Sequence, residues 1–260
     1  MDLQITGLTA LITGGSRGIG YAVAQSLAGE GCNLHLASRT TADLDSARSR
    51  LLQRYNVQVT CHTADLGQRG SSEQLAKECG AIDILVNNAG SIPRGELTDT
   101  TDSTWRSAWD LKVYGFINLS REVYRSMQAR GSGVIINIIG TAGEQPTYNY
   151  IIGSAGNAAL MGFSRALGSR SPDHGIRVVG LNPGSTETDR QRVRWEARAK
   201  DQLGDSSRWR ELVKNAPFGR LGKPEEVGDV VAFLASPRAG YISGTVITVD
   251  GGRAARHQGG

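Results

Sequence analysis

The glycine-rich segment at residues 13–20, TGGSRGIG, constrains the fold of this chain more than any other feature. It follows a short β-prone run and precedes a stretch of helical residues. Glycines in such a turn permit a tight bend and a close approach of the backbone to a pyrophosphate, which the free N–H groups of the helix start can bind. The segment therefore predicts a strand-turn-helix unit that binds a dinucleotide, although a glycine-rich turn by itself is a weak indicator.

The rest of the chain repeats this alternation of short β-rich runs and helical runs. Strands that alternate with helices form a parallel sheet with helices on both faces. Because no repeat or linker divides the chain, we predict one α/β domain with a Rossmann-type doubly wound parallel sheet at residues 1–252, and a flexible C-terminal tail at 253–260. Strands are expected at 8–15, 33–38, 57–65, 83–90, 133–140, 176–184 and 245–252, and helices at 18–30, 43–55, 73–78, 102–130, around 149–160 and at 224–236.

Charge and composition exclude several classes of function. The 29 Lys and Arg residues nearly balance 25 Asp and Glu residues, with no basic run of the kind that binds nucleic acid. No apolar run approaches membrane-spanning length, and the N-terminus does not resemble a secretory signal, so we expect a cytoplasmic protein. No metal site is predicted, because the cysteines and histidines lack ligand spacing. These residues are Cys32, Cys61, Cys79, His35, His62, His174 and His257.

The end of the second predicted strand indicates which dinucleotide is bound. An acidic side chain there would bind the ribose 2′-hydroxyl of NAD, but this chain has Ser38 and Arg39, and Arg17 lies within the glycine-rich turn. A guanidinium can pair with a 2′-phosphate through two parallel hydrogen bonds. The sequence therefore favours NADP(H) over NAD(H).

Further motifs make the chain similar to the short-chain dehydrogenase/reductase family over nearly its full length. Besides TGGSRGIG they are AD-L at 64–66, NNAG at 87–90, NPG at 182–184 and GYISGTVITVDGG at 240–252. The resemblance implies an oxidoreductase acting on a carbonyl or alcohol, assembled as a homodimer or homotetramer. The residues expected to bind the cofactor are Gly14, Ser16, Arg17, Gly18, Ile19, Gly20, Ser38, Arg39, Asp65, Leu66, Asn88, Ala89, Gly90, Asn157, Pro183, Gly184 and Thr188.

The residues that carry the family's chemistry are all replaced. The family's strand motif N-I-S-S-x-x-G reads NIIGTAG here, which puts Gly140 at the position of the catalytic serine. The Tyr-x-x-x-Lys helix motif reads GSAGN, so Gly153 and Asn157 stand at the tyrosine and lysine positions. Lys112 occupies the place of a helical asparagine. Loss of a general acid typically lowers the rate by about 10²–10⁴-fold, so these replacements argue against the standard mechanism.

Other side chains near these positions are candidates to replace the missing groups. The loop before the altered helix carries Glu144, Tyr148 and Tyr150. If Lys112 points inward, its ammonium group near the Tyr150 phenol would form a new acid/base pair. We therefore take Tyr150 and Lys112 as the candidate catalytic residues. The alternatives are a solvated lysine and a tyrosine that only packs.

The segment at residues 185–215 resembles the variable substrate lid of the family. Its eight basic residues are nearly balanced by six acids, which favours a surface of salt bridges over a site for an anionic substrate, an alternative that stays open. Trp195 and Trp209 are expected to pack within it.

Three functions are compatible with this sequence. The leading one is an NADP(H)-dependent oxidoreductase with non-standard acid/base residues. The second is a cofactor-binding pseudoenzyme or partner subunit without catalysis. The third is a non-redox lyase or isomerase that uses the enlarged cleft. The sequence does not identify the small-molecule substrate.

Overall fold

One parallel sheet forms the centre of the molecule, in agreement with the predicted fold class. The computed structural model describes residues 1–256, and within them seven parallel strands follow the order β3-β2-β1-β4-β5-β6-β7. The strands are β1 (Thr9–Thr13), β2 (Asn33–Ser38), β3 (Val59–Thr63), β4 (Ile84–Asn87), β5 (Gly133–Ile138), β6 (Ile176–Pro183) and β7 (Thr245–Val249).

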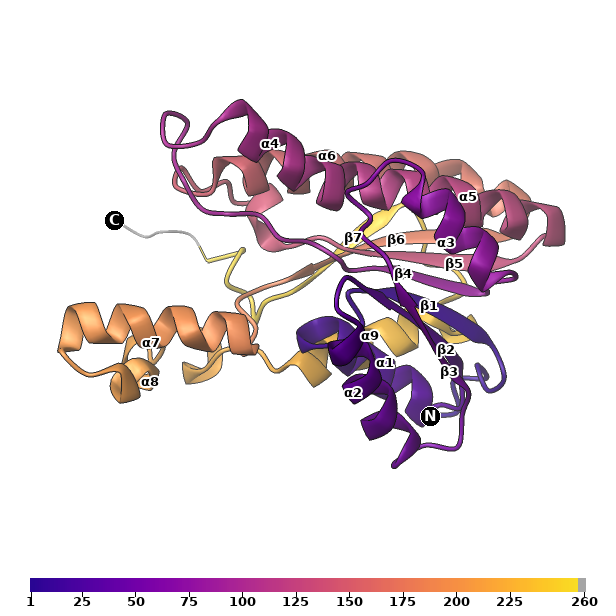
Figure 1. Cartoon of the computed structure of the whole chain (residues 1–260), viewed down its shortest axis with the longest axis horizontal. Coiled ribbons are helices and arrows are strands. Elements are labelled where there is room, and N and C mark those ends of the chain that lie inside the picture. The colour runs from indigo at the N-terminus through magenta and orange to yellow at the C-terminus, as the bar shows by residue number, and fades with distance from the viewer. Residues whose placement is uncertain (257–260) are drawn as a thin grey trace.

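Helices cover both faces of this sheet (Figure 1). Successive side chains of a strand point to opposite faces, so Ala10 and Ile12 of β1 pack in one core cluster and Leu11 in another. One face is covered by α1 (Gly18–Gly29), α2 (Thr41–Leu52) and α9 (Pro224–Ala235). The other face is covered by α3 (Ser71–Cys79), α4 (Asp102–Trp109), α5 (Gly115–Arg130) and α6 (Ile151–Arg170).

The strand order reverses at β1, which pairs with β2 on one side and with β4 on the other. In open α/β sheets the crevice at such a switch point, beyond the carboxyl ends of the strands, is the usual ligand site. The glycine-rich turn follows β1 and the NNAG segment follows β4. Both motifs therefore lie at this crevice.

The helix predicted at 102–130 is confirmed in extent but is not α-helical throughout. Between α4 and α5 lies a π-helical turn, η1 (Asp110–Tyr114). Such turns inside α-helices are frequent at functional sites. Lys112 belongs to this turn and is only 7% exposed. The lysine therefore points inward, which the sequence could not decide.

The predicted lid forms a lobe that extends from the body of the molecule (Figure 1). It contains α7 (Asp189–Leu203), η4 (Ser206–Arg208) and α8 (Trp209–Leu212). Trp209 is buried in a separate apolar cluster with Ala199, Val213 and Leu221, and Trp195 packs against it. Both tryptophans thus pack within the lobe, as expected.

Short helical turns connect several of these elements. They are η2 (Thr141–Gly143), η3 (Ser171–His174), η5 (Pro217–Gly219) and η6 (Pro237–Ala239).

The C-terminal segment after β7 begins as a series of turns. The Ala254 amide donates to the Asp250 carboxylate at 2.6 Å, and Arg256 donates to the Asn215 carbonyl at 3.5 Å. The rest of the predicted tail, residues 257–260 with His257, lies outside the described residues. No helix in the described part of the chain has the length and apolar character needed to cross a membrane.

Candidate active site

A cleft of about 780 Å³ opens at the carboxyl ends of the central strands. All of the residues expected to bind the cofactor line it except Gly20 and Asp65. Gly20 packs instead against the turn, where a Cβ atom would overlap the Gly14 carbonyl oxygen. The Asp65 carboxylate accepts a hydrogen bond from the Gly67 amide at 3.1 Å and shapes the loop beside Leu66. Both residues therefore contact residues that line the cleft, although they do not line it themselves.

The glycine-rich turn has a backbone that few other residues can adopt. Gly14 and Gly18 have φ values of +64° and +57°, a region that favours glycine. A Cβ atom at position 14 would also lie 2.9 Å from Nδ2 of Asn88. The turn therefore keeps its backbone accessible at the start of α1, as a pyrophosphate cradle requires.

Hydrogen bonds join the turn to the NNAG segment. The Thr13 hydroxyl accepts from the backbone amides of Asn88 and Ala89 at 2.9 and 3.0 Å. The Asn88 side-chain amide donates to the Thr13 carbonyl at 3.0 Å. These bonds hold the ends of β1 and β4 together, which keeps the floor of the cleft in one arrangement.

The end of the cleft beside β2 carries the residues expected to bind a 2′-phosphate. Ser38, Arg39 and Arg17 all line it, and both arginines are accessible. Arg17 lies 3.8 Å from the Asp43 carboxylate, a partner that the sequence did not indicate. Arg39 has no ion pair within residues 1–256. Its guanidinium is thus available to an anion.

Lys112 is buried in the wall of the cleft. Its Nζ donates to the Ile138 carbonyl at 2.7 Å and lies 4.6 Å from the centroid of the Phe116 ring. The side chain passes so close to Gly90 that a Cβ atom there would lie 2.7 Å from Cδ of Lys112. Burial, together with the charge of Arg190, lowers the pKa of Lys112 to about 7. An amine with this pKa can exchange a proton near neutral pH.

The aromatic ring of Tyr150 occupies the space that Gly153 leaves open. A Cβ atom at position 153 would overlap Cε1 and Cζ of Tyr150. The ring therefore reaches, from the loop before α6, the space beside Gly153, which the sequence aligns with the family's tyrosine. The Tyr150 hydroxyl has no hydrogen-bond partner among the described residues, and it lines the cleft with Lys112.

The charges around Tyr150 differ from the expected ones. Burial raises the pKa of Tyr150, while the charges of Arg94, Arg190 and Arg194 act in the opposite direction. We expected the Lys112 ammonium to be the cation next to this phenol. The cations that act on the phenol are instead these three arginines, and the Lys112 ammonium is directed to the Ile138 carbonyl.

Gly140 and Asn157, which the sequence aligns with the family's serine and lysine, lie in contact with each other. Gly140 has a φ of +128°, where any other residue is strained. A Cβ atom there would lie 3.1 Å from Nδ2 of Asn157, which donates to the Gly140 carbonyl at 3.3 Å. A serine at position 140 would therefore need a different backbone.

Two other candidates from the loop lie outside the cleft lining. Glu144 accepts hydrogen bonds from the Asn182 amide at 2.9 Å and from the Thr248 hydroxyl at 3.0 Å, so it links β6 to β7. Tyr148 is 69% exposed. Only Tyr150 of the three lines the cleft.

Sequence reasoning noted Arg190 and Arg194 only as two of the eight basic residues of the lid, and it did not single out Arg94. Arg190 and Arg194 line the cleft from α7, and Arg94 lies beside Tyr150. The spacing of Arg190 and Arg194, four residues apart on one helix face, could have indicated the pair. Because the basic and acidic residues of the lid nearly balance overall, this pair did not stand out in the sequence.

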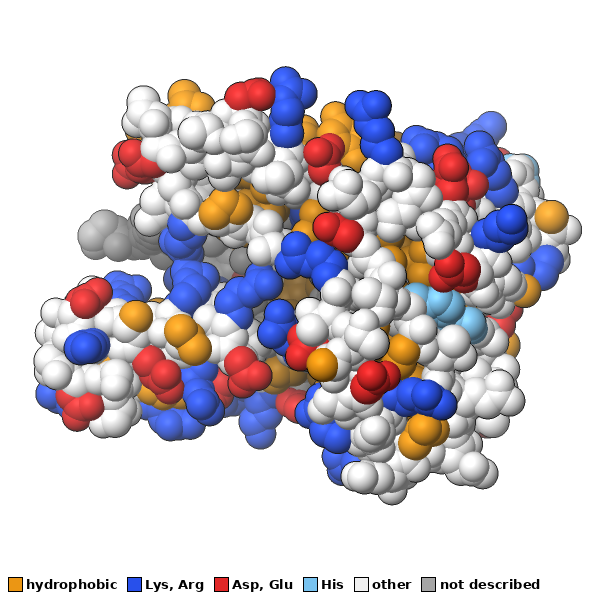
Figure 2. Space-filling model, viewed as in Figure 1, with side chains coloured by type: hydrophobic (Ala, Val, Ile, Leu, Met, Phe, Trp, Pro, Cys, Tyr) orange, Lys and Arg blue, Asp and Glu red, His pale blue; other side chains and the backbone are white. Residues whose placement is uncertain are grey.

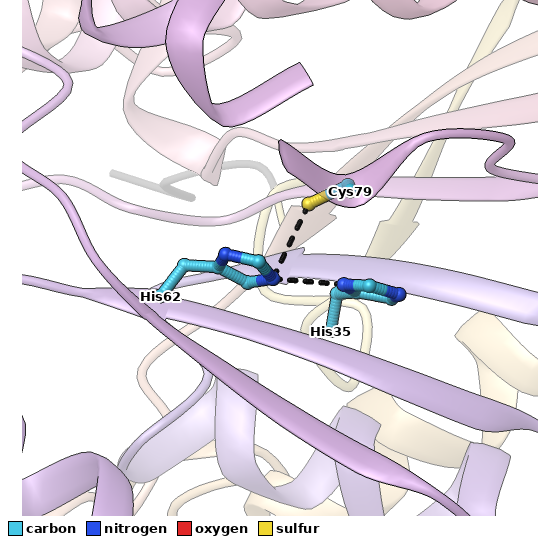
Figure 3. Close-up of side chains that lie close together, drawn as sticks. All are labelled: His35, His62 and Cys79. Atoms are coloured by element: carbon cyan, nitrogen blue, oxygen red, sulfur yellow. Dashed lines mark hydrogen bonds between the residues drawn. The ribbon is translucent and has the colours of Figure 1, made fainter. Parts of the chain in front are cut away.

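A cluster of potential metal ligands lies away from the cleft lining. The described residues bring His35 of β2, His62 of β3 and Cys79 of α3 together, as Figure 3 shows. The two imidazole nitrogens are 2.8 Å apart, a hydrogen-bond distance, whereas two nitrogen ligands of a tetrahedral zinc ion lie about 3.3 Å apart. Burial raises the pKa of the Cys79 thiol to about 12, which keeps it protonated. The geometry is that of a hydrogen-bonded cluster.

The fold and the cleft together define a doubly wound dinucleotide-binding protein. A family model described as Enoyl-(Acyl carrier protein) reductase matches residues 14–254. The 3-oxoacyl-(acyl-carrier-protein) reductase of Vibrio harveyi is 33% identical over 254 residues, covering 96% of this chain and 98% of that protein. Galactitol 2-dehydrogenase (L-tagatose-forming) of Cereibacter sphaeroides is 31% identical over 254 residues, with 96% of both chains covered.

Solved structures show the same relationship. L-sorbose reductase from Gluconobacter frateurii, complexed with NADPH and L-sorbose, has a TM-score of 0.94 and 33% sequence identity. The match covers 99% of this chain and 100% of that one. The chain belongs to the short-chain dehydrogenase/reductase family, as its motifs predicted.

Proposed function

We propose that this protein is an NADP(H)-dependent oxidoreductase that acts on a carbonyl or alcohol group, with Lys112 and Tyr150 in place of the family's acid/base residues. The observation that carries the proposal is the buried Lys112 amine, which lines the cofactor cleft beside Gly90 and has a pKa of about 7. Perturbed pKa values in a cleft are typical of groups that take part in catalysis.

In this proposal the two side chains have different tasks. When bound, NADPH supplies the hydride that reduces the substrate carbonyl. Lys112 provides the proton for the carbonyl oxygen, because an amine with a pKa of about 7 is partly protonated at neutral pH and releases its proton readily. Tyr150 stays protonated, since burial raises its pKa, and its free hydroxyl donates a hydrogen bond that orients the substrate.

The preference for NADP(H) rests on Arg39 and Arg17, and the NADPH complex of L-sorbose reductase supports it. We expect Arg39→Asp to weaken NADPH binding about 10–100-fold and to leave NADH binding nearly unchanged, because it removes a charge-assisted contact to the 2′-phosphate. Calorimetric titration of both cofactors checks this. Arg48→Asp, an exposed change on α2, serves as the control. Unchanged selectivity in Arg39→Asp would contradict the assignment.

Two measurements test the function as a whole. Calorimetry with NADPH and NADH establishes cofactor binding, and nicotinamide absorbance with a panel of ketones, aldehydes and alcohols establishes turnover. Turnover that decreases strongly in Tyr150→Phe supports the proposal. NADPH binding without turnover over the whole panel would instead support a pseudoenzyme, and substrate conversion without an absorbance change would support a lyase or isomerase.

We also propose that the chain assembles as a homodimer or homotetramer. Small exposed residues of α6, among them Ala155, Ala158 and Ala159, allow a second helix to approach closely. The proposal follows the family resemblance, and light scattering on the purified protein tests it.

A further inference from the structure

Three arginines lie near Tyr150, and two of them line the cleft. Arg190 and Arg194 lie four residues apart on the first turns of α7, and both line the cleft. Arg94, in the loop after β4, has its guanidinium carbon 5.7 Å from the centroid of the Tyr150 ring. Lys and Arg side chains gather along the hollow between the α7–α8 lobe and the body of the molecule (Figure 2). We call Arg94, Arg190 and Arg194 the arginine triad.

Among the described residues, no carboxylate pairs with the arginine triad. Within residues 1–256, no Asp or Glu oxygen lies within 4.0 Å of these three guanidinium groups. The Asp189 carboxylate lines the same cleft but does not reach this distance. Other arginines of the lid do have partners: Arg192 pairs with Glu196, Arg208 with Glu211 and Arg210 with Glu187. Although the charges of the lid nearly balance overall, the two lid arginines that line the cleft have no acidic partner among the described residues.

The arginine triad also leaves most of its hydrogen-bond donors unused. A guanidinium has five N–H donors. Arg94 donates to the Asn149 side chain at 3.0 Å, Arg190 to the Gly90 carbonyl at 3.4 Å and Arg194 to the Gln191 side chain at 3.3 Å. These neutral contacts orient the side chains without cancelling their charge. Like charges near one another are unfavourable, and a bound anion would relieve this repulsion.

We propose that the arginine triad binds an anionic oxygen group, a carboxylate or a phosphate, of the substrate. Guanidinium forks match the planar geometry of such groups and bind them through paired hydrogen bonds. Because Arg94 lies against the Tyr150 ring and Arg190 and Arg194 line the same cleft as Tyr150, the anionic group and the reacting carbonyl belong to one small molecule. The inference rests on the proposed oxidoreductase function and narrows its substrates to acids and phosphate esters that carry a carbonyl or alcohol group.

Kinetics with matched substrates tests this inference. The pairs are acetoacetate against ethyl acetoacetate, and dihydroxyacetone phosphate against dihydroxyacetone. We expect the wild-type protein to prefer the charged member of at least one pair. Arg94→Met and Arg194→Met should each lower kcat/KM for that member about 10–100-fold, the effect of a lost charged hydrogen bond, with little change for the neutral member. Arg192→Met, on the same helix but paired with Glu196, should keep the preference.

Binding measurements separate this inference from the proposed function. Calorimetry with succinate and with inorganic phosphate, in the presence of NADP⁺, needs no turnover. Binding of either probe that is lost in Arg194→Met and kept in Arg192→Met supports the anion site, and the probe that binds identifies the group. If neither probe binds and no charged substrate is preferred, the inference is wrong even if neutral carbonyls are reduced.

One more outcome would overturn the inference. If Arg94→Met and Arg194→Met weaken NADPH binding and leave the ratio of kcat/KM between charged and neutral substrates unchanged, the triad binds a cofactor phosphate. If no carbonyl is reduced but succinate or phosphate binding depends on Arg194, the proposed function fails and the anion site stands.

Discussion

Replacing Lys112 by methionine is expected to lower the rate of carbonyl reduction by about 10²–10⁴-fold, the usual contribution of a general acid. The pH profile should change as well. Because Lys112 has a pKa of about 7, its protonated form is lost as the pH rises above 7, and wild-type reduction should slow by up to about tenfold per pH unit. Alcohol oxidation uses the neutral amine and should accelerate as the pH rises to about 7. Lys112→Met should lose both dependences, as steady-state rates from pH 5 to 9 would show.

The pH dependence of the free energy of unfolding provides a second test of the lowered pKa of Lys112. The unfolded chain keeps the Lys112 proton up to the ordinary pKa, and the folded chain releases it near pH 7. Between these values the unfolded state binds more protons, so stability rises with pH. The free energy of unfolding of the wild type, relative to Lys112→Met, should rise by up to about 1.4 kcal/mol per pH unit from pH 7 to 10. The matched control is Lys77→Met, an exposed lysine on α3. Equal pH profiles for Lys112→Met and the wild type would refute the assignment of Lys112.

The Gly153→Ala variant is expected to lose about 1–3 kcal/mol of stability, because its methyl group would overlap the Tyr150 ring. In an ordinary helix interior the same change stabilises by roughly 0.5–1 kcal/mol. If the ring moves out to avoid the overlap, activity should fall at least as much as in Tyr150→Phe. Chemical denaturation and the reductase assay measure the two effects.

The same helix provides the control for this prediction. Gly162 also lies in α6, and a Cβ atom there has no neighbour within 4 Å, so Gly162→Ala should stabilise the protein. In a Tyr150→Ala background, Gly153→Ala should become neutral or stabilising, because the overlapping ring is gone. This change of sign is a coupling between the two sites, which a double-mutant cycle measures. Additive effects would show that the ring does not fill the space above Gly153.

Much of the fold followed from local patterns in the chain. The alternation of β-rich and helical runs predicted the parallel sheet, and the glycines at 14, 18 and 20 predicted a turn that the backbone confirms with positive φ values at Gly14 and Gly18. The π-helical turn around Lys112 was not predictable, because residues 102–130 read as one helix. The periodicity of apolar residues predicts which residues are helical. It does not predict where one turn widens from the α-helical to the π-helical hydrogen-bond pattern.

The cluster of His35, His62 and Cys79 was missed for a related reason. Its members lie on two strands and a helix, and only the pairing of β2 with β3 under α3 brings them together. Ligand spacing within the sequence detects sites on one loop or helix and overlooks such groups.

By itself, the sequence determined the family fold and the position of the cleft, and it predicted the loss of the family's catalytic residues, since each depends on residue type at a local motif. Only the tertiary structure decided which side chains meet in that cleft. It placed the Tyr150 ring over Gly153, buried the Lys112 amine against the Ile138 carbonyl, and brought Arg190 and Arg194 to the cleft lining with Arg94 against the Tyr150 ring. Burial and charge proximity arise when distant segments pack together, and these two quantities determine whether a side chain can bind an anion or exchange a proton.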